Sequence, residues 1–169
     1  MKTTVVIPHH NKHDLLSRLL SNIDNSIFDI IIVSGGTFAE NCNKGAKLSN
    51  GNIIFCNDDC YPSNEDLIRI SDAIDNNIVG STQISKKGNV YGGVIGYNRK
   101  LKYPYYPKLT TEKNVLFPSG FLFGMNRSTF NYLGGFNESY KNGYEDVDLF
   151  FKAIEYSIPF EILELKCST

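Results

Sequence analysis

The sequence predicts one α/β domain with a mostly parallel sheet. Apolar β-branched runs alternate with helical patterns through the first half, no linker interrupts the chain, and the third run ends on two adjacent carboxylates, Asp58 and Asp59. This alternation favours a parallel sheet whose helices cross over between neighbouring strands. Because such sheets bind ligands at the carboxyl ends of their strands, the two acids mark the expected site.

The first half, residues 1–84, alternates strands and helices. A β-branched run at 3–7 ends at Pro8, and leucines at helical spacing follow from Lys12. Ser63 and Asp66 match a capping box at the start of a later helix. The expected strands are 3–7, 28–33, 53–55 and 78–84, and the expected helices follow Lys12, begin near Cys42 and follow Ser63.

The second half, residues 85–169, has a different pattern. Residues 86–89 predict a turn that joins 78–84 to a strand at 90–95 as a hairpin. Residues 99–116 lack periodicity and predict a long loop. The remaining expected elements are a kinked strand at 116–125, a short helix capped by Ser128 or Thr129, a helix at 145–156 with Val147, Phe150, Phe151 and Ile154 inward, and a strand at 160–165.

The composition excludes several classes of partner. With 169 residues, 41% of them hydrophobic, the chain can bury a core, and its net charge of −1 gives no basic excess for nucleic acid or anionic lipid. The first strand follows Met1 and Lys2 directly, so we expect no signal peptide or membrane segment and a cytoplasmic location. The four cysteines lack paired metal-ligand spacing and are expected to be reduced thiols.

The acidic pair, Asp58 and Asp59, suits a divalent cation. Two neighbouring carboxylates repel each other. A cation bound between this pair and a further anion offsets the free-energy cost of that repulsion. Hard oxygen ligands favour Mg²⁺ or Mn²⁺, which often also hold substrate phosphates. A solvated turn is the commoner setting of this dipeptide, so the pair alone does not establish a metal site.

A second acidic cluster follows Gly143. Glu145, Asp146 and Asp148 fall in the first turn of an expected helix, where the helix dipole favours any one of them. Three acids within four positions exceed what capping requires. A carboxylate fixed there could accept a proton from an attacking hydroxyl. One cluster would then hold a metal and a leaving phosphate while the other activates the nucleophile, which is the layout of a transferase.

Four segments, in order, resemble the inverting nucleotide-sugar glycosyltransferases of the GT-A fold, of the family-two type. They are VVIPHHNKHDLL, NKGAKLSNGNIIFCNDDC, FPSGFLFGMNRSTFNYLGGFNES and NGYEDVDLFFKA, and the last also resembles the carboxyl-terminal motif of galactosyltransferases. The resemblance covers most of the chain. It implies a compact GT-A domain over residues 1–169, with a nucleotide-binding half at 1–84 and an acceptor and catalytic-base half at 85–169.

The resemblance also implies roles for individual residues. Asp146 corresponds to the base that deprotonates the acceptor, with Glu145 positioning the acceptor beside it. Asp59 corresponds to the first ligand of Mn²⁺ or Mg²⁺, supported by Asn57 or Asp58. The residues implied to bind the nucleotide sugar are Pro8, His9, His10, Asn11, Ser34, Gly35, Asn43, Asp58 and Gly120. For the histidines, a polar loop facing water is the competing interpretation.

The resemblance implies a metal-dependent glycosyltransferase of the hexosyltransferase type, which moves a sugar from a UDP-sugar to a hydroxyl acceptor with inversion. Three departures from the family stand against it: the second strand ends on Ser34 and Gly35 rather than an acid, no histidine follows His13, and the chain is short. The first leaves the choice of nucleotide open. The other two favour the alternative of a non-catalytic sugar-nucleotide or glycan binder that needs a partner, whereas Asp59 and Asp146 oppose it. Assembly as a homo-oligomer or with a partner subunit is left open. A nucleotidyltransferase would need a glycine-rich phosphate loop after the first strand, where Pro8 and His9 stand instead.

Overall fold

The computed structural model describes residues 2–10, 13–84, 90–91, 93–95, 108–110, 115–141 and 143–168. The expected turn at 86–89 and most of the expected loop at 99–116 lie outside these ranges, as does Asn11.

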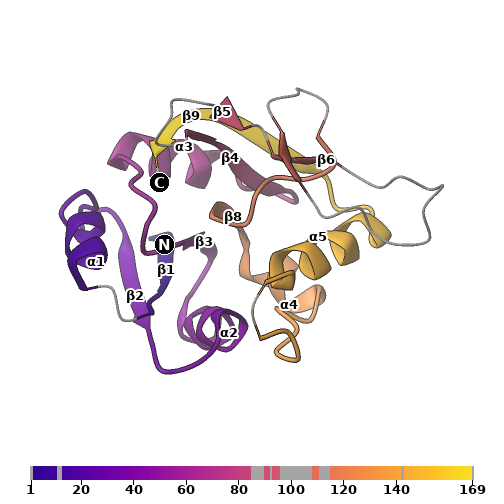
Figure 1. The fold of residues 1–169 in the computed structure, drawn as a ribbon, viewed down its shortest axis with the longest axis horizontal. Helices are drawn as coiled ribbons and strands as arrows, with labels where there is room; N and C mark the ends of the chain where they lie inside the picture. The colour runs from indigo at the N-terminus through magenta and orange to yellow at the C-terminus, as the bar shows by residue number, and fades with distance from the viewer. Residues whose placement is uncertain are drawn as a thin grey trace.

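A seven-stranded sheet forms the centre of the molecule (Figure 1). Its order is β2 (Asp29–Val33), β1 (Thr4–Pro8), β3 (Asn52–Cys56), β8 (Leu122–Asn126), β4 (Ile78–Ile84) and β5 (Val90–Tyr91), and β9 (Phe160–Ser168) also pairs with β4. Strand β1 is parallel to β2 and β3, and β4 is parallel to β9. Strand β8 runs antiparallel to both β3 and β4, and β5 runs antiparallel to β4. The mostly parallel sheet is confirmed: five of its seven strands share one direction, β8 is inverted near the centre, and β5 is inverted at the edge.

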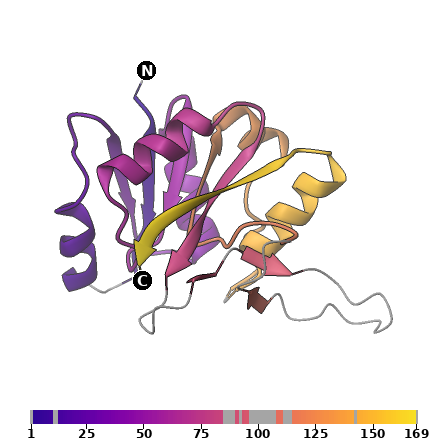
Figure 2. The ribbon, with the colours of Figure 1, turned by 90° about the horizontal axis from the view of Figure 1, so that it is seen from above.

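In the described parts of the chain, five helices cover the two faces of this sheet (Figure 2). They are α1 (His13–Leu20), α2 (Phe38–Leu48), α3 (Asn64–Ala73), α4 (Arg127–Tyr132) and α5 (Glu145–Glu155). Alternation along β1 separates the faces: Val5 and Ile7 pack with α1 and α3, whereas Val6 packs with α2, α4 and α5. No helix within the described ranges has the length and apolar character that crossing a membrane requires.

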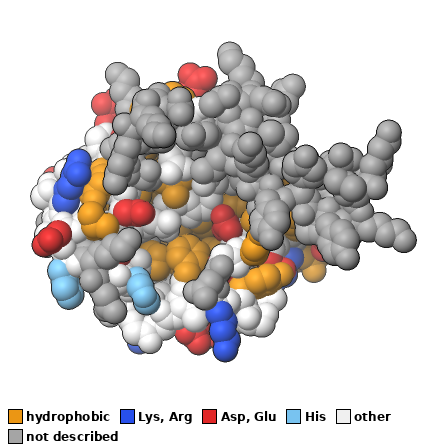
Figure 3. Space-filling view, in the orientation of Figure 1, with side chains coloured by type: hydrophobic (Ala, Val, Ile, Leu, Met, Phe, Trp, Pro, Cys, Tyr) orange, Lys and Arg blue, Asp and Glu red, His pale blue; other side chains and the backbone are white. Residues whose placement is uncertain are grey.

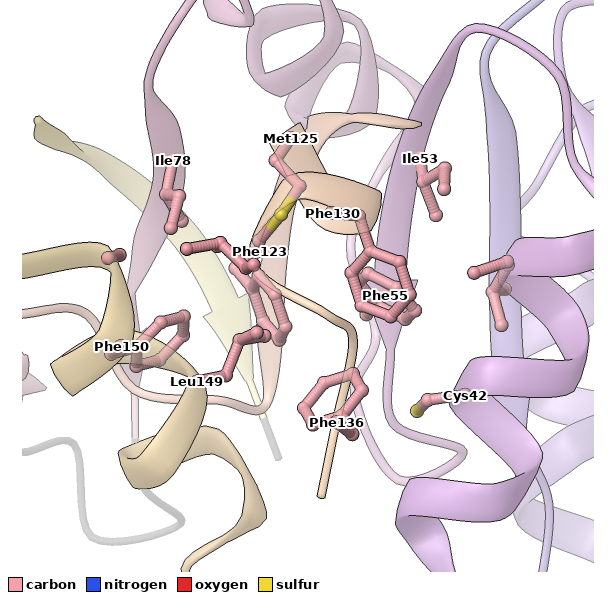
Figure 4. Close-up of a cluster of buried hydrophobic side chains, with 14 of the residues drawn as sticks. Cys42, Ile53, Phe55, Ile78, Phe123, Met125, Phe130, Phe136, Leu149 and Phe150 are labelled. Atoms are coloured by element: carbon pink, nitrogen blue, oxygen red, sulfur yellow. The ribbon is translucent and has the colours of Figure 1, made fainter. Parts of the chain in front are cut away.

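A cluster of phenylalanines joins α4 and α5 to the sheet (Figure 4). Phe123 of β8 lies at its centre, with ring centroids 5.1 Å from Phe55 of β3 and 5.1 Å from Phe150 of α5. Phe130 and Phe136 close the cluster around Phe55. Burying each ring contributes about 1.5–3 kcal/mol to folding, so the cluster holds α5 against strands β3 and β8. Because this core combines residues of both halves, the chain folds as one domain.

The predicted capping box at Ser63 is confirmed, since Ser63 Oγ accepts from Asp66 N and the Asp66 side chain accepts from Ser63 N. The predicted cap of α4 is wrong. Asn126 is the N-cap, and its Oδ1 accepts from Thr129 N at 2.8 Å, while Ser128 donates to the same oxygen at 2.7 Å. Strand β8 leads directly into α4, so Asn126, the last residue of β8, occupies the capping position.

Three further expectations differ from the structure. The kinked strand at 116–125 is regular only from Leu122, because Pro118 to Gly120 interrupts it. Residues 90–95 form two strands rather than one: β5 joins the main sheet, and β6 (Gly93–Ile95) pairs with β7 (Lys108–Thr110), a strand that the loop prediction missed. On α5 the buried positions include Leu149, Phe150 and Ala153, so Ile154 faces outward with 38% of its surface exposed.

Candidate active site

A cavity of about 730 Å³ opens at the carboxyl ends of the parallel strands. Its wall includes the turns that follow β1 and β3, the loop between β2 and α2, the loop before β8, and the start of α5. Figure 3 shows one face of the molecule, on which acidic and histidine side chains lie beside exposed hydrophobic surface. The cavity lies at the edge of the sheet where the sequence predicted a site.

Asp146 lies on this wall in the first turn of α5. Its Oδ1 accepts from Val147 N at 2.9 Å, and the backbone N–H of Gly120 also donates to its carboxylate. A Cβ atom built on Gly120 would lie 2.3 Å from Asp146 Oδ2, so only glycine allows the loop before β8 to approach this closely. Burial raises the pKa of Asp146 above its usual value, and the charge of Glu145 adds to this, although backbone N–H donors oppose it.

Glu145 lies beside Asp146 and is 5% exposed. Gly143 N donates to its Oε1 at 3.1 Å. The chain enters α5 through two residues with positive φ, Gly143 at 104° and Tyr144 at 73°. A left-handed conformation costs a tyrosine about 1–2 kcal/mol, and such strain gathers at functional sites. The charge of Glu145 also reaches helix α2. Burial raises the pKa of the Cys42 thiol, and the Glu145 charge adds to that rise.

His9 and Asp58 join the turn after β1 to the turn after β3. His9 Nδ1 lies 2.9 Å from Asp58 Oδ2, and His10 N donates to the same oxygen at 3.2 Å. His9 is 6% exposed and forms part of the cavity wall, as do Pro8 and His10. Asp58 therefore links two strand ends through hydrogen bonds.

The three predicted metal ligands are not brought together at the cavity. Asn57 is on its wall, whereas Asp58 is bonded to His9, and Asp59 is absent from the described residues that line it. Within the part of the chain that the structure describes, no group of three or more His, Cys, Asp or Glu side chains is arranged to hold a metal ion. Of the three predicted ligands, Asn57 is therefore the one that lines the cavity.

The remaining predicted nucleotide contacts are divided. Ser34 and Gly35 are not among the described lining residues of the cavity. Asn43 joins α2 to the segment after α4: its Nδ2 donates to Phe136 O at 2.9 Å and to Glu138 Oε1 at 2.8 Å, and Phe136 N donates to its Oδ1 at 2.9 Å. Its amide therefore joins these two segments, and Asn43 is not among the described residues that line the cavity.

The loop between β2 and α2 supplies a wall that the sequence analysis missed. Asn41 is 4% exposed and binds the backbone of Gly36 in both directions, with its Oδ1 accepting at 3.1 Å and its Nδ2 donating at 3.1 Å. Thr37 and Glu40 form a capping box at the start of α2. That spacing of Thr and Glu is a signal that could have placed the helix start, and hence this wall, from the sequence.

Lys141 is the second feature that was missed. It is exposed, lies on the cavity wall, and is the one Lys or Arg among the described lining residues. No periodic pattern singles it out, because it lies in an irregular segment before α5. Its ammonium group can attract a phosphate.

Comparison with solved structures shows that the chain has the GT-A fold expected from the sequence. S. aureus TarS 1–349 matches with a TM-score of 0.68 at 15% identity, covering 100% of this chain and 60% of that one. The complex of TarS 1–349 with UDP-GlcNAc matches at 0.70 and 16%, covering 100% and 58%. The catalytic domain of Drosophila β1,4-galactosyltransferase 7, in complex with xylobiose, matches at 0.60 and 14%, covering 95% and 64%.

This chain thus spans about three fifths of the length of the structures it matches. No protein-family model and no curated protein sequence matches it. At these identities the likeness establishes the fold.

Proposed function

We propose that this chain is a glycosyltransferase that moves a sugar from a UDP-sugar to a hydroxyl group of an acceptor, with inversion at the anomeric carbon. The observation that carries the proposal is the Asp146 carboxylate, which faces a cavity at the strand ends and has a pKa raised by burial. The fold similarity to glycosyltransferases, one of them in complex with UDP-GlcNAc, supports the class of reaction.

In the proposed step Asp146 accepts the proton of the acceptor hydroxyl. The hydroxyl oxygen then forms a bond to the anomeric carbon while the bond from that carbon to the diphosphate oxygen breaks. The diphosphate leaves with the electron pair, and attack from the opposite side inverts the configuration. Burial and the neighbouring Glu145 make Asp146 a stronger base than an exposed aspartate, which favours this proton transfer.

The surroundings of Asp146 hold it ready for this role. Two backbone N–H groups, from Val147 and Gly120, fix the direction of the carboxylate. A base held in one orientation gains rate because little ordering remains to be done in the transition state. Lys141 is exposed on the cavity wall, and its charge can attract the leaving diphosphate.

The donor would span the cavity from one half of the chain to the other. The turn after β1 and the loop before α2 would hold the nucleoside, and the start of α5 would hold the reacting end. Strand β1 is two positions from β8 in the sheet, and each spacing is about 4.8 Å, so these two strands are about 10 Å apart. A diphosphate and a sugar ring can bridge that distance.

Dependence on Mn²⁺ or Mg²⁺ is a separate proposal. Asn57 is the one predicted ligand on the cavity wall, so the transfer step above is written without a cation. Such ions often keep several waters and bind mainly through substrate phosphates. The proposal predicts that nucleotide binding weakens when a chelator removes the ion.

The test combines binding with turnover. Calorimetric titration of UDP, GDP, CDP and ADP, with Mn²⁺ and then with chelator, should give binding of the uridine nucleotide. Release of UDP from a panel of UDP-sugars is then measured with hydroxyl acceptors for the wild type, Asp146→Asn and Asp148→Asn. Asp148 is the matched control, because it shares the first turn of α5 but pairs with Lys152 at 2.9 Å.

The proposal expects Asp146→Asn to bind UDP and lose transfer, and Asp148→Asn to keep both. Full transfer by Asp146→Asn would refute the assignment of the base. Binding of UDP without transfer of any sugar would favour the non-catalytic binding module.

A further inference from the structure

Three of the four cysteines share one part of the core. Cys56, Cys60 and Cys167 are buried in the apolar cluster on the face of the sheet that α1 and α3 cover. Cys60 Sγ lies 2.8 Å from Cys167 Sγ, although the two residues are 107 positions apart. All the cysteines are thiols in this structure. A pair so distant along the chain has no spacing pattern, which is why the sequence analysis expected reduced thiols.

The contact between Cys60 and Cys167 is close to the geometry of a disulfide bond. Bonded sulfurs lie about 2.0 Å apart, so a movement of less than about 1 Å joins the two. Cys56 has a different partner, because its Sγ donates to Asn57 O at 3.6 Å. In the described part of the chain no group of three or more His, Cys, Asp or Glu side chains is arranged to hold a metal ion, so the cysteine cluster does not indicate a metal site.

The carboxyl end of β9 offers a route to this buried pair. Both thiols have 0% of their surface exposed, so an oxidant reaches them only when a neighbouring segment moves. The ladder between β4 and β9 is irregular, with a register shift between Ser81 and Gln83. Two residue pairs lie beyond the shift, Gln83 with Cys167 and Ile84 with Ser168. Local opening of these two pairs would uncover Cys167 while the rest of β9 stays in the sheet.

We infer that Cys60 and Cys167 form a disulfide bond when a small-molecule disulfide such as oxidised glutathione is present. One protein thiol displaces a glutathione thiol and forms a mixed disulfide. The second protein thiol attacks the protein sulfur of that mixed disulfide, which forms the protein disulfide and releases the second glutathione thiol. The two protein sulfurs lose two electrons and two protons, and the two glutathione thiols carry them away. The inference does not depend on the proposed function.

This bond would join β9 to the turn after β3. Cys60 N donates to Asn57 O at 3.0 Å and closes that turn, and Asn57 lies on the wall of the cavity. A cross-link over 107 positions removes much of the conformational freedom of the unfolded chain. The bond should therefore stabilise the whole fold, and it should hold one wall of the cavity to the edge of the sheet.

The test measures which cysteines become linked in the full chain. The folded protein is incubated with chelator at a series of ratios of reduced to oxidised glutathione, and remaining thiols are then alkylated in denaturant. At the oxidising end, two of the four cysteines should be protected from alkylation. Trypsin digestion without reduction should give residues 48–69, which contain Cys56 and Cys60, linked to residues 167–169.

Alanine variants identify the sulfur that carries the link, since alanine adds no polar group to the core. Cys60→Ala should lose the linked peptide, whereas Cys56→Ala should retain it. Cys42→Ala is the matched control, because Cys42 is buried in the other core cluster, and it should also retain the link. The oxidised wild type should melt roughly 5–15 °C above the reduced protein, and Cys60→Ala should melt at the same temperature in both buffers.

Four alkylated cysteines at the most oxidising ratio would overturn the inference. A link confined to residues 48–69 would also overturn it, because it would join Cys56 to Cys60. A stable mixed disulfide with glutathione in place of the linked peptide would show that the second thiol is out of reach, and would refute it as well. An equal or lower melting temperature of the linked protein would contradict the stabilising role of the bond. Because each readout is independent of nucleotide binding and transfer, these outcomes leave the proposed function intact.

Discussion

The two acidic clusters of this chain lie in contrasting surroundings. At the strand ends, Asp58 Oδ2 is hydrogen-bonded to His9 Nδ1 and accepts from the backbone N–H of His10. At the start of α5, Asp146 is held by backbone N–H groups next to a second carboxylate, Glu145, and burial raises its pKa. A carboxylate with a histidine partner fixes geometry, whereas a buried carboxylate beside another acid retains affinity for a proton.

The contrast teaches that neighbours assign the role of an acid, and position along the sequence does not. Each cluster has a local sequence signal: one follows a strand, and the other begins a helix. The surroundings of the two clusters differ in their tertiary contacts, because Gly120 packs against Asp146 and His9 is hydrogen-bonded to Asp58.

Replacing Asp146 should have the largest effect on the comparison. Asp146→Asn removes the proton acceptor and keeps the shape, so transfer should fall by about 10²- to 10⁴-fold with UDP affinity unchanged. Asp148→Asn should retain the wild-type rate. Initial rates of UDP release measure both variants, and equal losses in the two would mean that α5 has been disturbed as a whole.

Gly120→Ala should be the next largest. The added Cβ overlaps the Asp146 carboxylate and must displace it, and a shift of about 1 Å at a catalytic group can cost about 100-fold in rate. Gly45→Ala is the control, because its Cβ would lie 2.3 Å from Val6 Cγ1 in the core. That variant should lose roughly 1–3 kcal/mol of stability to overpacking while its folded fraction stays active. Wild-type turnover by Gly120→Ala would contradict the geometry proposed for Asp146.

The pH dependence of transfer should report the same carboxylate. The base must be deprotonated, so the rate should fall about tenfold per pH unit below the pKa of Asp146. Because that pKa is raised, the fall should begin at a higher pH than for an ordinary aspartate. Glu145→Gln removes a neighbouring negative charge and should move the acid limb to lower pH. An unmoved limb would exclude Glu145 as a cause of the shift.

Asp59→Ala tests whether the strand-end acids also hold a cation. If Asp59 is a metal ligand, UDP affinity in Mn²⁺ should fall about tenfold, and the variant should match the wild type in chelator. Calorimetric titrations under both conditions measure the difference. Equal affinities in Mn²⁺ would agree with the absence of Asp59 from the described cavity wall and would refute its role as a ligand.

The smallest expected effect is on stability. The folded pKa of Asp146 is raised, so its protonated form favours folding at low pH, and this contribution is lost as pH rises through the folded pKa. Asp146→Asn stays neutral, so at neutral pH it should melt roughly 2 °C above the wild type, with no difference in acid. Thermal unfolding at the two pH values measures this, and a lower melting temperature at neutral pH would contradict burial as the main cause of the shift.

Local patterns predicted most of the elements of this fold. The four strands expected in residues 1–84, the Ser63 capping box and the acids at the start of α5 each depend on residues within a few positions, and the structure contains them. The direction of β8 could not be predicted, because an apolar run has the same pattern in a parallel and an antiparallel strand. The exposure of Ile154 and the N-cap at Asn126 were not predicted. Each depends on how the helix meets its neighbouring elements, which the local sequence does not show.

The site was less predictable than the fold. Asp146, Glu145 and Gly120 were identified through motif resemblance, and the structure brings them to one cavity. The pairing of His9 with Asp58 joins residues 49 positions apart, and no local pattern shows such a contact. Asn43 lies in one of the segments that resemble the family, but its side chain is hydrogen-bonded to Phe136 in another part of the chain. The resemblance gave no sign of this contact.

The central place of β8 has a consequence for how the chain folds as it is synthesised. Strands β3 and β4 are made early, yet each pairs with β8, whose residues emerge about 40 positions after β4 ends. Until then both strands have an unpaired edge, which is prone to association with other chains. A fragment of residues 1–84 should therefore aggregate rather than fold, and long-range pairing of this kind makes folding slow.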